Sequence, residues 1–557
     1  MDFTQIAIFL VIAAIVGVIA KSLRQPPLVG YLFAGIILSL GGFIKDTPTL
    51  SSLAQIGVTL LLFLLGMEMN LKDIPTVGKS SIIIGLGQMI ITSASGYLLA
   101  ILMGFTPMAS LYIAVALTFS STIIVIKFLS EKRDLKSLYG KIAVGTLLFQ
   151  DFIAMIILII LSGIKQGSSD PLAILTIFIK TIVLFIGAFL LSKKVMPILY
   201  EKVISSSNEL LFIVSIAWAL GVASFVSGAF GFTPEIGGFL AGLTLSNLPE
   251  HLQIASLTRP LRDFFLTIFF VYLGAKLTIV SNTLTVILEG VIFSLFVLIG
   301  KPIIVFIVKG LLGYRKRTSF LTGITMGQIS EFSFIMLVMG ESLGHVGKKE
   351  VGLVILVGVV TMTMSTYLIQ GAEKIYSLLS SYLVIFERKK TKESVLISET
   401  KLTDHIILVG AGRTGLSLTR YFKKKNLTFI VVDFDPTVFN KLTADNIPIV
   451  FGDINDMDII EASNIKYARL LVSTIPSFED NLLILKNINL IKRQLPTILT
   501  AGDMKDGIRL YEAGASYVIV PEIAAGEHIR HILDVFGTQG ERLKEVGKSH
   551  FERLIFT

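Results

Sequence analysis

Long apolar stretches separated by short polar segments run through the first two thirds of the chain. About thirteen of these stretches contain roughly 18 or more mostly apolar residues, the length at which a helix crosses a bilayer. We place them near residues 4–22, 27–44, 50–68, 80–104, 108–130, 139–163, 171–192, 209–227, 231–248, 261–280, 282–312, 317–343 and 351–371. The pattern predicts a polytopic α-helical membrane region over residues 1–382.

Two parts of this apolar region repeat. Residues 27–39 return as residues 234–246, at an offset of 234 − 27 = 207, and residues 65–69 return as residues 273–277, at 273 − 65 = 208. An odd number of predicted spans separates the copies, so the second copy crosses the membrane in the opposite direction. Inverted repeats are typical of secondary transporters, whose substrate site lies where the two halves meet.

Basic residues gather in alternate loops, near residues 21–24, 72–79, 132–141, 193–202, 259–262 and 309–317. Such loops lie on the cytoplasmic side, so we expect a multi-pass protein of the cell membrane with its N-terminus outside and its C-terminal region in the cytoplasm. These loops explain the formal charge of +9 without nucleic acid as a partner. The chain has no cysteine, and its six histidines show no metal-ligand spacing, so no bound metal is expected.

Asp151 is the strongest candidate for an ion site. It lies in a predicted span with apolar residues on both sides and no basic residue within a helical turn. Ionisable groups at bilayer depth are costly and mark ion paths. A carboxylate there can carry a proton or face a desolvated cation, but hardly both at once, which is the simplest chemistry of cation–proton exchange. A structural acid that caps a helix or pairs with a lysine is the alternative.

Small and polar residues cluster within one predicted span of each half. The clusters contain Thr118, Ser120, Ser121 and Thr122 in the first half, and Gln328, Ser330 and Glu331 in the second. Such clusters can mark broken helices, whose freed backbone groups and half-helix ends coordinate ions. Lys301 and Glu331 can compensate the partial charges at the converging half-helix ends. We expect this structural role for both, with direct ion binding as the alternative.

The pattern changes near residue 383. A charged linker over residues 383–403 precedes short strand-like runs that alternate with amphipathic helical patterns. This alternation predicts a parallel, Rossmann-like α/β domain over residues 404–524, followed by a C-terminal tail over residues 525–557.

A nucleotide site is expected in this domain. A strand pattern over residues 405–409 leads into a glycine loop, and the next strand pattern ends at Asp433, 433 − 410 = 23 residues after the first glycine. The glycines let backbone N–H groups approach phosphates, and Asp433 can accept hydrogen bonds from ribose hydroxyls. The loop residues concerned are Gly410, Gly412, Arg413, Thr414 and Gly415. A Rossmann fold without a ligand is the alternative.

Several motifs resemble the monovalent cation:proton antiporter-2 family, with the Kef-type potassium efflux antiporters as the nearest branch. They are Gln150-Asp151 and residues 24–32, 62–68 and 327–332, and the resemblance covers nearly the whole chain. It implies a thirteen-helix fold like that of bacterial sodium/proton antiporters, with two crossed broken helices, an elevator-like core and a homodimerising scaffold. Gln150 stands where many sodium/proton relatives have Asn or Asp. By analogy, this implies potassium and electroneutral one-for-one exchange.

The C-terminal region resembles the TrkA-N (RCK) regulatory domains of potassium transport proteins. This resemblance implies AMP, ADP, ATP or NAD(H) as a regulatory ligand, a contact of Asp453 with its adenine side, and an ancillary regulatory protein as a further partner. One departure concerns residues 248–259, which hold one acid where Kef proteins carry an acidic stretch. Glutathione gating therefore does not follow from the resemblance.

The sequence also bears on four other functions. A membrane-tethered dehydrogenase needs a catalytic lobe, and none is visible, so no enzyme is expected. A nucleotide-gated potassium channel needs a complete filter signature, of which residues 29–31 match a part. A solute symporter of the same fold and a sodium/proton antiporter stay open, because inverted repeats do not name a cargo and one Gln beside one Asp does not set cation size.

Overall fold

The computed structural model describes residues 3–43, 48–68, 78–132, 134–163, 171–199, 207–280, 284–380, 382–383, 402–454, 457–491, 494–537, 543–544 and 547–548. The chain divides into two compact units. The helical unit comprises Met1–Phe128, Ile142–Lys309 and Ser319–Ser381, and the sheet unit comprises Leu129–Lys141, Gly310–Thr318 and Tyr382–Thr557. Most of the expected linker, residues 384–401, lies outside the described residues, and the expected domain boundaries stay a prediction.

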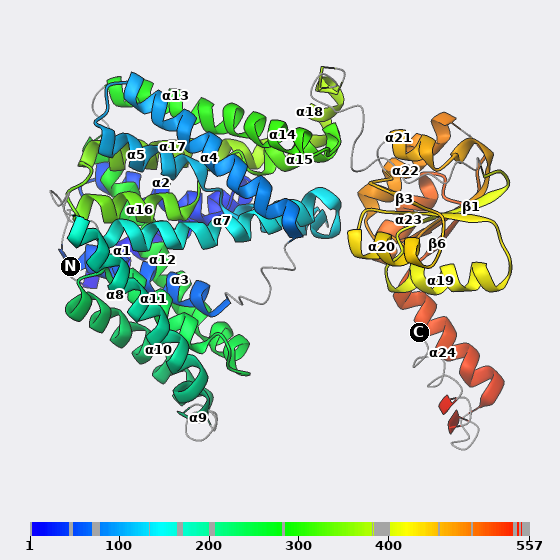
Figure 1. The fold of residues 1–557 in the computed structure, drawn as a ribbon, viewed down its shortest axis with the longest axis horizontal. Helices are drawn as coiled ribbons and strands as arrows, with labels where there is room; N and C mark the ends of the chain where they lie inside the picture. Colours follow the sequence, from blue (N-terminus) through cyan, green and yellow to red (C-terminus); the bar gives the residue numbers. More distant parts are fainter. Residues whose placement is uncertain are drawn as a thin grey trace. The chain divides into compact units, whose positions relative to one another are not determined.

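Helices make up the first of these units (Figure 1). Several begin with proline at the first helical position, where the missing N–H costs no hydrogen bond and φ is already helical. The first half contains α1 (Phe3–Ser22), α2 (Pro27–Leu40), α3 (Pro48–Glu68), α4 (Gly78–Leu102), α5 (Pro107–Thr118), α6 (Thr122–Glu131) and α7 (Leu138–Gly163).

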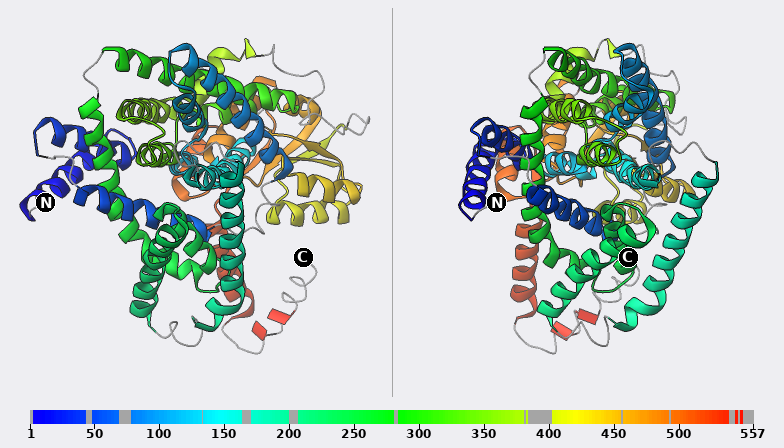
Figure 2. Two further views of the ribbon diagram at one scale, coloured as in Figure 1. Left: turned by 60° about the vertical axis from the view of Figure 1, so that its left-hand side comes forward. Right: turned by 90° about the vertical axis from the view of Figure 1, so that its left-hand side faces the viewer.

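The second half continues from α8 to α18. Its helices are α8 (Pro171–Leu190), α9 (Met196–Leu199), α10 (Asn208–Phe225), α11 (Pro234–Leu245), α12 (His251–Val280), α13 (Leu284–Leu295), α14 (Lys301–Leu311), α15 (Lys316–Thr325), α16 (Glu331–Ser342), α17 (Lys348–Gln370) and α18 (Ala372–Leu379). Three π-helical turns, at Leu191–Val195, Val226–Phe230 and Phe296–Gly300, continue α8, α10 and α13. Figure 2 shows the same helices from two further directions.

Within the described ranges, eight helical segments are long and apolar enough to cross a membrane, and Ala7–Ser22 and Pro27–Leu40 form shorter apolar helices. Large apolar side chains such as Val18 and Leu98 are more than half exposed on these helices, as expected for surfaces that face lipid. The helical membrane region is thus as predicted, whereas the span count of about thirteen stays a prediction.

The repeated sequences make the same contact twice. Gly35 of α2 lies against α12, where an added Cβ would be 2.0 Å from the carbonyl oxygen of Val271. Gly242 of α11 lies against α3, where an added Cβ would be 1.9 Å from the carbonyl oxygen of Phe63. The offsets are 242 − 35 = 207 and 271 − 63 = 208, which are those of the sequence repeat. The absence of a side chain at these glycines lets helices of opposite repeats touch backbone to backbone.

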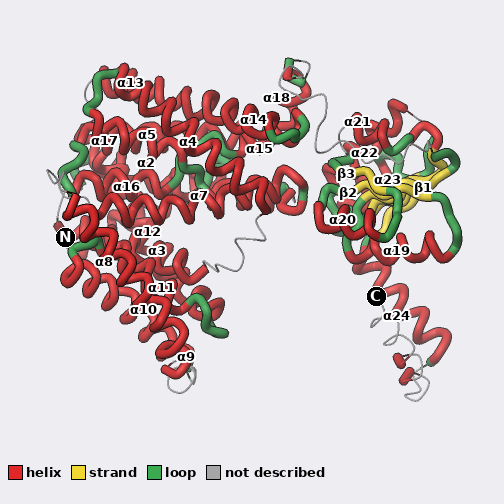
Figure 3. The backbone as a smooth tube through the Cα atoms, in the orientation of Figure 1, coloured by secondary structure: helices red, strands yellow, loops and turns green. Residues whose placement is uncertain are grey.

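The sheet unit contains the strands of the described chain (Figure 3). All six are parallel, in the order β3-β2-β1-β4-β5-β6. The elements are β1 (His405–Val409), α19 (Arg413–Lys424), β2 (Phe429–Asp433), α20 (Pro436–Ala444), β3 (Ile449–Phe451), α21 (Met457–Ala462), β4 (Ala468–Ser473), α22 (Phe478–Ile491), β5 (Thr497–Thr500), α23 (Met504–Glu512), β6 (Tyr517–Ile519) and α24 (Pro521–Phe536).

The strand order reverses between β1 and β4, and ligands of open parallel sheets bind at the carboxyl ends of strands beside such a point. Val409 lies next to Val432 of β2 and Ser473 of β4. The residues that follow these strands therefore share one edge. Fully buried Ile407, Leu408 and their neighbours hold this part of the sheet in the core, as the continuous apolar strand patterns predict.

Candidate functional site

Two helices of the helical unit are interrupted at the clusters of small and polar residues. In the first half α5 ends at Thr118 and α6 begins at Thr122, with Phe119 extended between them. In the second half α15 ends at Thr325 and α16 begins at Glu331. The interruptions touch each other, because the Ser120 hydroxyl donates to the Met326 carbonyl at 3.1 Å.

Lys301 joins the two breaks. Its ammonium group is fully buried and donates to the Phe119 carbonyl at 2.7 Å and to the Gln328 carbonyl at 2.9 Å. These carbonyls belong to the interrupted segments, where helical hydrogen bonding has been lost. The lysine side chain therefore satisfies backbone acceptors of both broken helices at once.

Asp151 lies on α7 with 6% of its surface exposed. Thr122, the first residue of α6, donates its hydroxyl proton to Asp151 Oδ2 at 2.9 Å. A carboxylate that keeps further acceptor sites beside one hydroxyl donor can bind a proton or a cation. The break between α5 and α6 thus meets this carboxyl group.

Glu331 brings a second carboxyl group to the same region. It is 5% exposed, and its side chain is hydrogen bonded by the hydroxyls of Ser121 and Ser330. It lies near Asp151, because the hydroxyls that donate to the two carboxyl groups belong to the consecutive residues Ser121 and Thr122. Ser330 also caps α16 by accepting from the N–H of Phe332 at 3.3 Å. The acids from the two halves are neighbours, which the sequence analysis did not anticipate.

Gln150 is fully buried and donates its carboxamide N–H to Oε1 of Gln88 on α4. Gln88 was not predicted from the sequence. The signal available there was its polarity within the otherwise apolar run of residues 82–91. The amide oxygens of Gln150 and Gln328 are buried and have no hydrogen-bond partner among the described residues.

The structure thus brings together the predicted residues of the helical unit. Thr122 is half-buried, and the others are buried: Thr118, Ser120, Ser121, Gln150, Asp151, Lys301, Gln328, Ser330 and Glu331. Within the described ranges, no group of three His, Cys, Asp or Glu residues could hold a metal ion. The site offers carboxylate, hydroxyl and amide oxygens, which can replace the hydration shell of a monovalent cation, and its carboxyl groups can also exchange a proton.

A second site lies in the sheet unit, where the glycine loop follows β1. Gly410 has φ of +83°, a left-handed conformation, and a Cβ there would be 2.9 Å from Thr474 Oγ1. A Cβ at Gly415 would lie 2.1 Å from the Gly410 carbonyl oxygen, so this glycine lets α19 pack against the loop. A Cβ at Gly412 would meet nothing within 4 Å, which leaves this part of the loop open.

A cavity of about 580 Å³ opens beside this loop. Of the predicted nucleotide residues, Gly410, Gly412, Asp433 and Asp453 line it, whereas Arg413, Thr414 and Gly415 are not among its lining residues. The cavity wall also includes residues that were read from the sequence as a cytoplasmic loop, namely Leu135, Ser137 and Lys141.

Asp433 ends β2 with its carboxylate held by the backbone. Oδ2 accepts from the Ala411 N–H at 2.6 Å and Oδ1 from the Asp435 N–H at 2.7 Å. Burial raises the pKa of Asp433 above its usual range, and these two hydrogen bonds oppose the shift. The carboxylate is thereby fixed at the strand end where a ribose would be held in a dinucleotide site.

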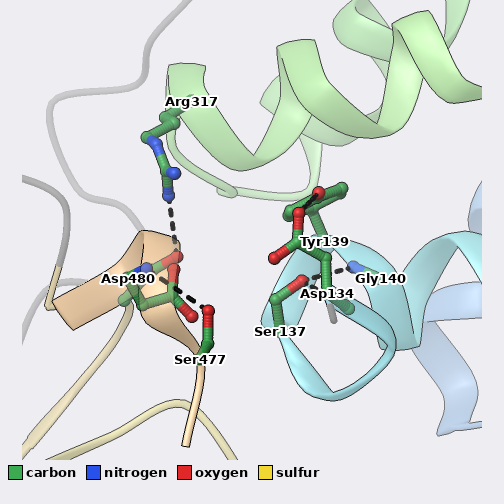
Figure 4. Close-up of polar contacts among 8 residues, drawn as sticks. Asp134, Ser137, Tyr139, Gly140, Arg317, Ser477 and Asp480 are labelled. Carbon is green, nitrogen blue, oxygen red and sulfur yellow. Dashed lines mark hydrogen bonds and ion pairs between the residues drawn. The ribbon is translucent and has the colours of Figure 1, made fainter. Parts of the chain in front are cut away.

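Asp453 lines the cavity but is paired with Arg317 at 2.9 Å, and both side chains are buried. Asp480 at the start of α22 lies close to this pair, and its backbone N–H donates to the Ser477 hydroxyl at 3.3 Å (Figure 4). Burial and then the nearby carboxylates of Asp453 and Asp134 raise the pKa of Asp480 to about 7, whereas Arg317 opposes the shift.

The segment from residue 134 to residue 141 is itself well ordered by hydrogen bonds (Figure 4). Ser137 donates to the Asp134 carbonyl at 2.7 Å and accepts from the Gly140 N–H at 3.1 Å, and Tyr139 donates to the Asp134 carboxylate. Lys141 forms an ion pair with Asp435 at 2.9 Å. Lys141, whose charge the sequence assigned to membrane topology, therefore also lines this cavity.

Comparison with known families decides the identity of the helical unit. Residues 8–371 match the family described as "Sodium/hydrogen exchanger, transmembrane", which is 371 − 8 + 1 = 364 of the 557 residues. The chain belongs to this sodium/hydrogen exchanger family. Residues 406–521 match the TrkA-N domain. The expected combination of an antiporter-type membrane region with a TrkA-N domain is thereby confirmed.

Individual relatives of this chain also have names that describe cation antiporters. The chain is 28% identical to YbaL of Escherichia coli (strain K12), named as a candidate cation/proton antiporter, over 84% of this chain and 86% of the relative. It is 30% identical to K(+) efflux antiporter 5 of Arabidopsis thaliana over 63% of each chain. The sodium proton antiporter MjNhaP1 from Methanocaldococcus jannaschii, at 16% identity, covers 68% of this chain and 96% of its own with a TM-score of 0.50, which shows a shared fold.

Proposed function

We propose that the protein exchanges potassium for protons across a membrane, with Asp151 as the group that carries either the proton or the cation. The observation that carries this proposal is the buried Asp151 carboxyl, bonded by Thr122 where two broken helices meet. A buried carboxylate is stable when a proton or a cation compensates its charge. Loading the cation therefore releases the proton, and one site open alternately to either side produces antiport.

Potassium is proposed because relatives are named K(+) efflux antiporters and because an amide precedes Asp151. Exchange is proposed to be electroneutral, since one proton replaces one cation at Asp151. Glu331 accepts hydrogen bonds from Ser121 and Ser330 and is assigned, with Lys301, to support of the broken helices. A sodium/proton antiporter on the same site is the second candidate.

The test uses purified protein in liposomes with an internal pH dye and an outward proton gradient. Addition of potassium, sodium, lithium or rubidium should dissipate the gradient, with potassium effective at the lowest concentration. Asp151→Asn should abolish this movement, because an amide cannot exchange a proton, while the variant elutes as a folded protein. Asp263→Asn is the matched control, since that carboxylate is 63% exposed beside Arg262. Substantial exchange by Asp151→Asn at neutral pH contradicts the assignment.

The same liposomes test whether the exchange moves net charge across the membrane. Electroneutral exchange proceeds equally fast when the membrane potential is clamped at zero and when it is imposed with either sign. A rate that follows the potential contradicts one-for-one stoichiometry and brings Glu331 into the transport cycle as a second proton carrier. Sodium as the preferred ion supports the second candidate and leaves the role of Asp151 unchanged.

Nucleotide regulation is proposed for the sheet unit. It is supported by the open glycine loop, the fixed Asp433 and the cavity of about 580 Å³. Candidate ligands are AMP, ADP, ATP and NAD(H), whose phosphates suit the helix N-terminus at Gly412. A ligand shifts transport when it binds the two states of the protein with different affinity.

Titration calorimetry with the full chain should detect binding of one of these ligands, and Asp433→Ala should weaken its affinity about tenfold or more. Binding of none of them contradicts the regulatory assignment.

A homodimer in the cell membrane, with the N-terminus outside and the sheet unit in the cytoplasm, completes the proposal. Helix α24 supports pairing, because none of its residues is buried and it exposes Ile523, Ile529, Leu533 and Val535. Figures 1 and 2 show this helix extending from the sheet. Crosslinking in native membranes tests the dimer, and accessibility of single introduced cysteines tests the orientation.

A further inference from the structure

Gln88 is a buried polar residue that the proposed exchange mechanism does not use. It lies near the middle of α4, its side chain is fully buried, and apolar residues surround it in the sequence. A buried carboxamide in a membrane helix is costly unless its hydrogen bonds are satisfied. The side chain of Gln88 forms hydrogen bonds with Thr92, Thr118 and Gln150, the residue that precedes Asp151.

The orientation of the Gln88 amide follows from its partners. Its Nε2 donates to the Thr118 carbonyl at 3.2 Å and to the Thr92 hydroxyl at 3.1 Å. A backbone carbonyl can only accept, so the group that faces it must be the NH₂ and not the oxygen. Oε1 of Gln88 is therefore the atom that faces Gln150, and it can only accept.

The hydrogen bond with Gln88 also determines the orientation of the Gln150 amide. Because Gln88 presents an acceptor, Gln150 must present Nε2 to it, and the Gln150 oxygen is left over. This oxygen is buried and has no hydrogen-bond partner among the described residues. Buried acceptors without a partner are uncommon, and a bound ion is one of the groups that can satisfy them. Carbonyl-type oxygens are groups that replace the hydration shell of potassium.

Gln150 and Asp151 are directed to the same segment. Gln150 is linked through Gln88 to Thr118, the last residue of α5, and Asp151 accepts from Thr122, the first residue of α6. Gln150 and Asp151 are consecutive residues of α7, and the amide nitrogen of one and the carboxylate of the other are each linked by hydrogen bonds to one side of the same helix break.

We propose that Gln88 is a positioning residue that turns the Gln150 amide so that its oxygen serves as a cation ligand beside Asp151. The proposal rests on cation–proton exchange at Asp151 and adds the determinant of cation selectivity. Without Gln88 the Gln150 amide is free to rotate, and its NH₂ can face the cation. The positive end of the Gln150 amide dipole then faces the cation in place of the negative end.

The test compares cation dependence in the proteoliposome assay for the wild type, Gln88→Met, Gln150→Met and the double variant. Methionine keeps the length of the side chain and removes its hydrogen-bonding groups. Gln88→Met should raise the potassium concentration for half-maximal rate about tenfold, the size of effect seen when a group that orients a metal ligand is lost. It should also weaken the preference for potassium over lithium. The double variant should match Gln150→Met, because Gln88 acts through Gln150.

Two further variants separate positioning from folding. Thr92→Val removes the other side-chain partner of Gln88 and should leave the half-maximal concentration unchanged. Gln88→Glu, measured on the acid side of neutrality, keeps an acceptor for Gln150 and should retain near-normal affinity even if Gln88→Met does not fold. If Gln88→Met folds with affinity and ion order at wild-type values, or if Gln88→Glu folds but loses potassium affinity, the inference is wrong and the exchange mechanism stands. If the wild type moves no protons on addition of any cation, the exchange mechanism itself fails.

Discussion

The backbone contacts between the repeats give a prediction whose size can be worked from the structure. Gly242→Ala adds one methyl group on α11, and that carbon would be 1.9 Å from the Phe63 carbonyl oxygen of α3. Ordinary contact begins at 3.4 Å, so the helices must separate by 3.4 − 1.9 = 1.5 Å. The blocking atom is backbone, which cannot rotate away as the end of a side chain can.

The expected loss of stability is the difference between two effects. Overpacking of a close contact costs about 1–3 kcal/mol, and a backbone obstacle places this site at about 3 kcal/mol. Alanine is favoured over glycine in a helix by about 1 kcal/mol, which offsets part of that cost. Gly242→Ala should therefore destabilise the protein by about 2 kcal/mol. At Gly221 of α10 an added Cβ meets nothing within 4 Å, so Gly221→Ala keeps the gain of about 1 kcal/mol.

Thermal unfolding in detergent, followed by a thiol-independent dye or by light scattering, measures the difference. The two variants should differ by about 3 kcal/mol, which corresponds to about 6 °C at roughly 2 °C per kcal/mol for a large domain. Gly35→Ala should behave as Gly242→Ala does, because it meets the Val271 carbonyl oxygen at 2.0 Å. Equal melting temperatures for Gly242→Ala and Gly221→Ala would refute the close backbone contact, and a large difference between Gly35→Ala and Gly242→Ala would refute its repetition.

Two other predictions concern buried charges. Lys301→Met should lower stability by about 2–3 kcal/mol, because two buried backbone carbonyls lose their hydrogen-bond donor. Lys180→Met, which removes one carbonyl contact of a half-buried lysine, should cost less in the same melting assay; equal losses would contradict the bridging role. Folding raises the pKa of Asp480 from 3.8 to about 7, so its contribution to stability is complete below pH 3.8 and is lost as the pH rises through about 7. Asp480→Asn should flatten the pH dependence of the melting temperature between about pH 4 and 7, and exposed Glu479→Gln should not.

Much of the architecture could be predicted because membrane helices and parallel sheets leave strong local signals. Apolar runs of span length follow from the need to bond every backbone group within the helix. The helix breaks could be located from small and polar residues at Thr118–Thr122 and around Gln328, because such residues are unusual in the middle of a span. The order of strand, glycine loop, strand and Asp433 likewise pointed to the sheet edge where the cavity lies.

The features of the two sites that could not be predicted from the sequence depend on contacts between residues far apart in the chain. Gln88 has no signal beyond its polarity, and its role comes from meeting Gln150, 150 − 88 = 62 residues later. Arg317 was read as a loop charge that sets topology, yet it is buried and paired with Asp453. The proximity of Glu331 to Asp151 also depends on how the broken helices cross. Such pairings are set by tertiary packing and leave no periodic pattern in the sequence.

The sheet unit is assembled from three separate stretches of chain, and this has a consequence for dissection of the protein. A protease that cuts within residues 384–401 breaks the chain once, yet residues 129–141 and 310–318 of the same unit remain covalently part of the membrane fragment. A fragment that ends near residue 385 therefore keeps Arg317 without Asp453 and Lys141 without Asp435. A separately expressed C-terminal fragment contains Asp435 and Asp453, so a split protein that combines both fragments is the proper reference for any deletion of the sheet unit.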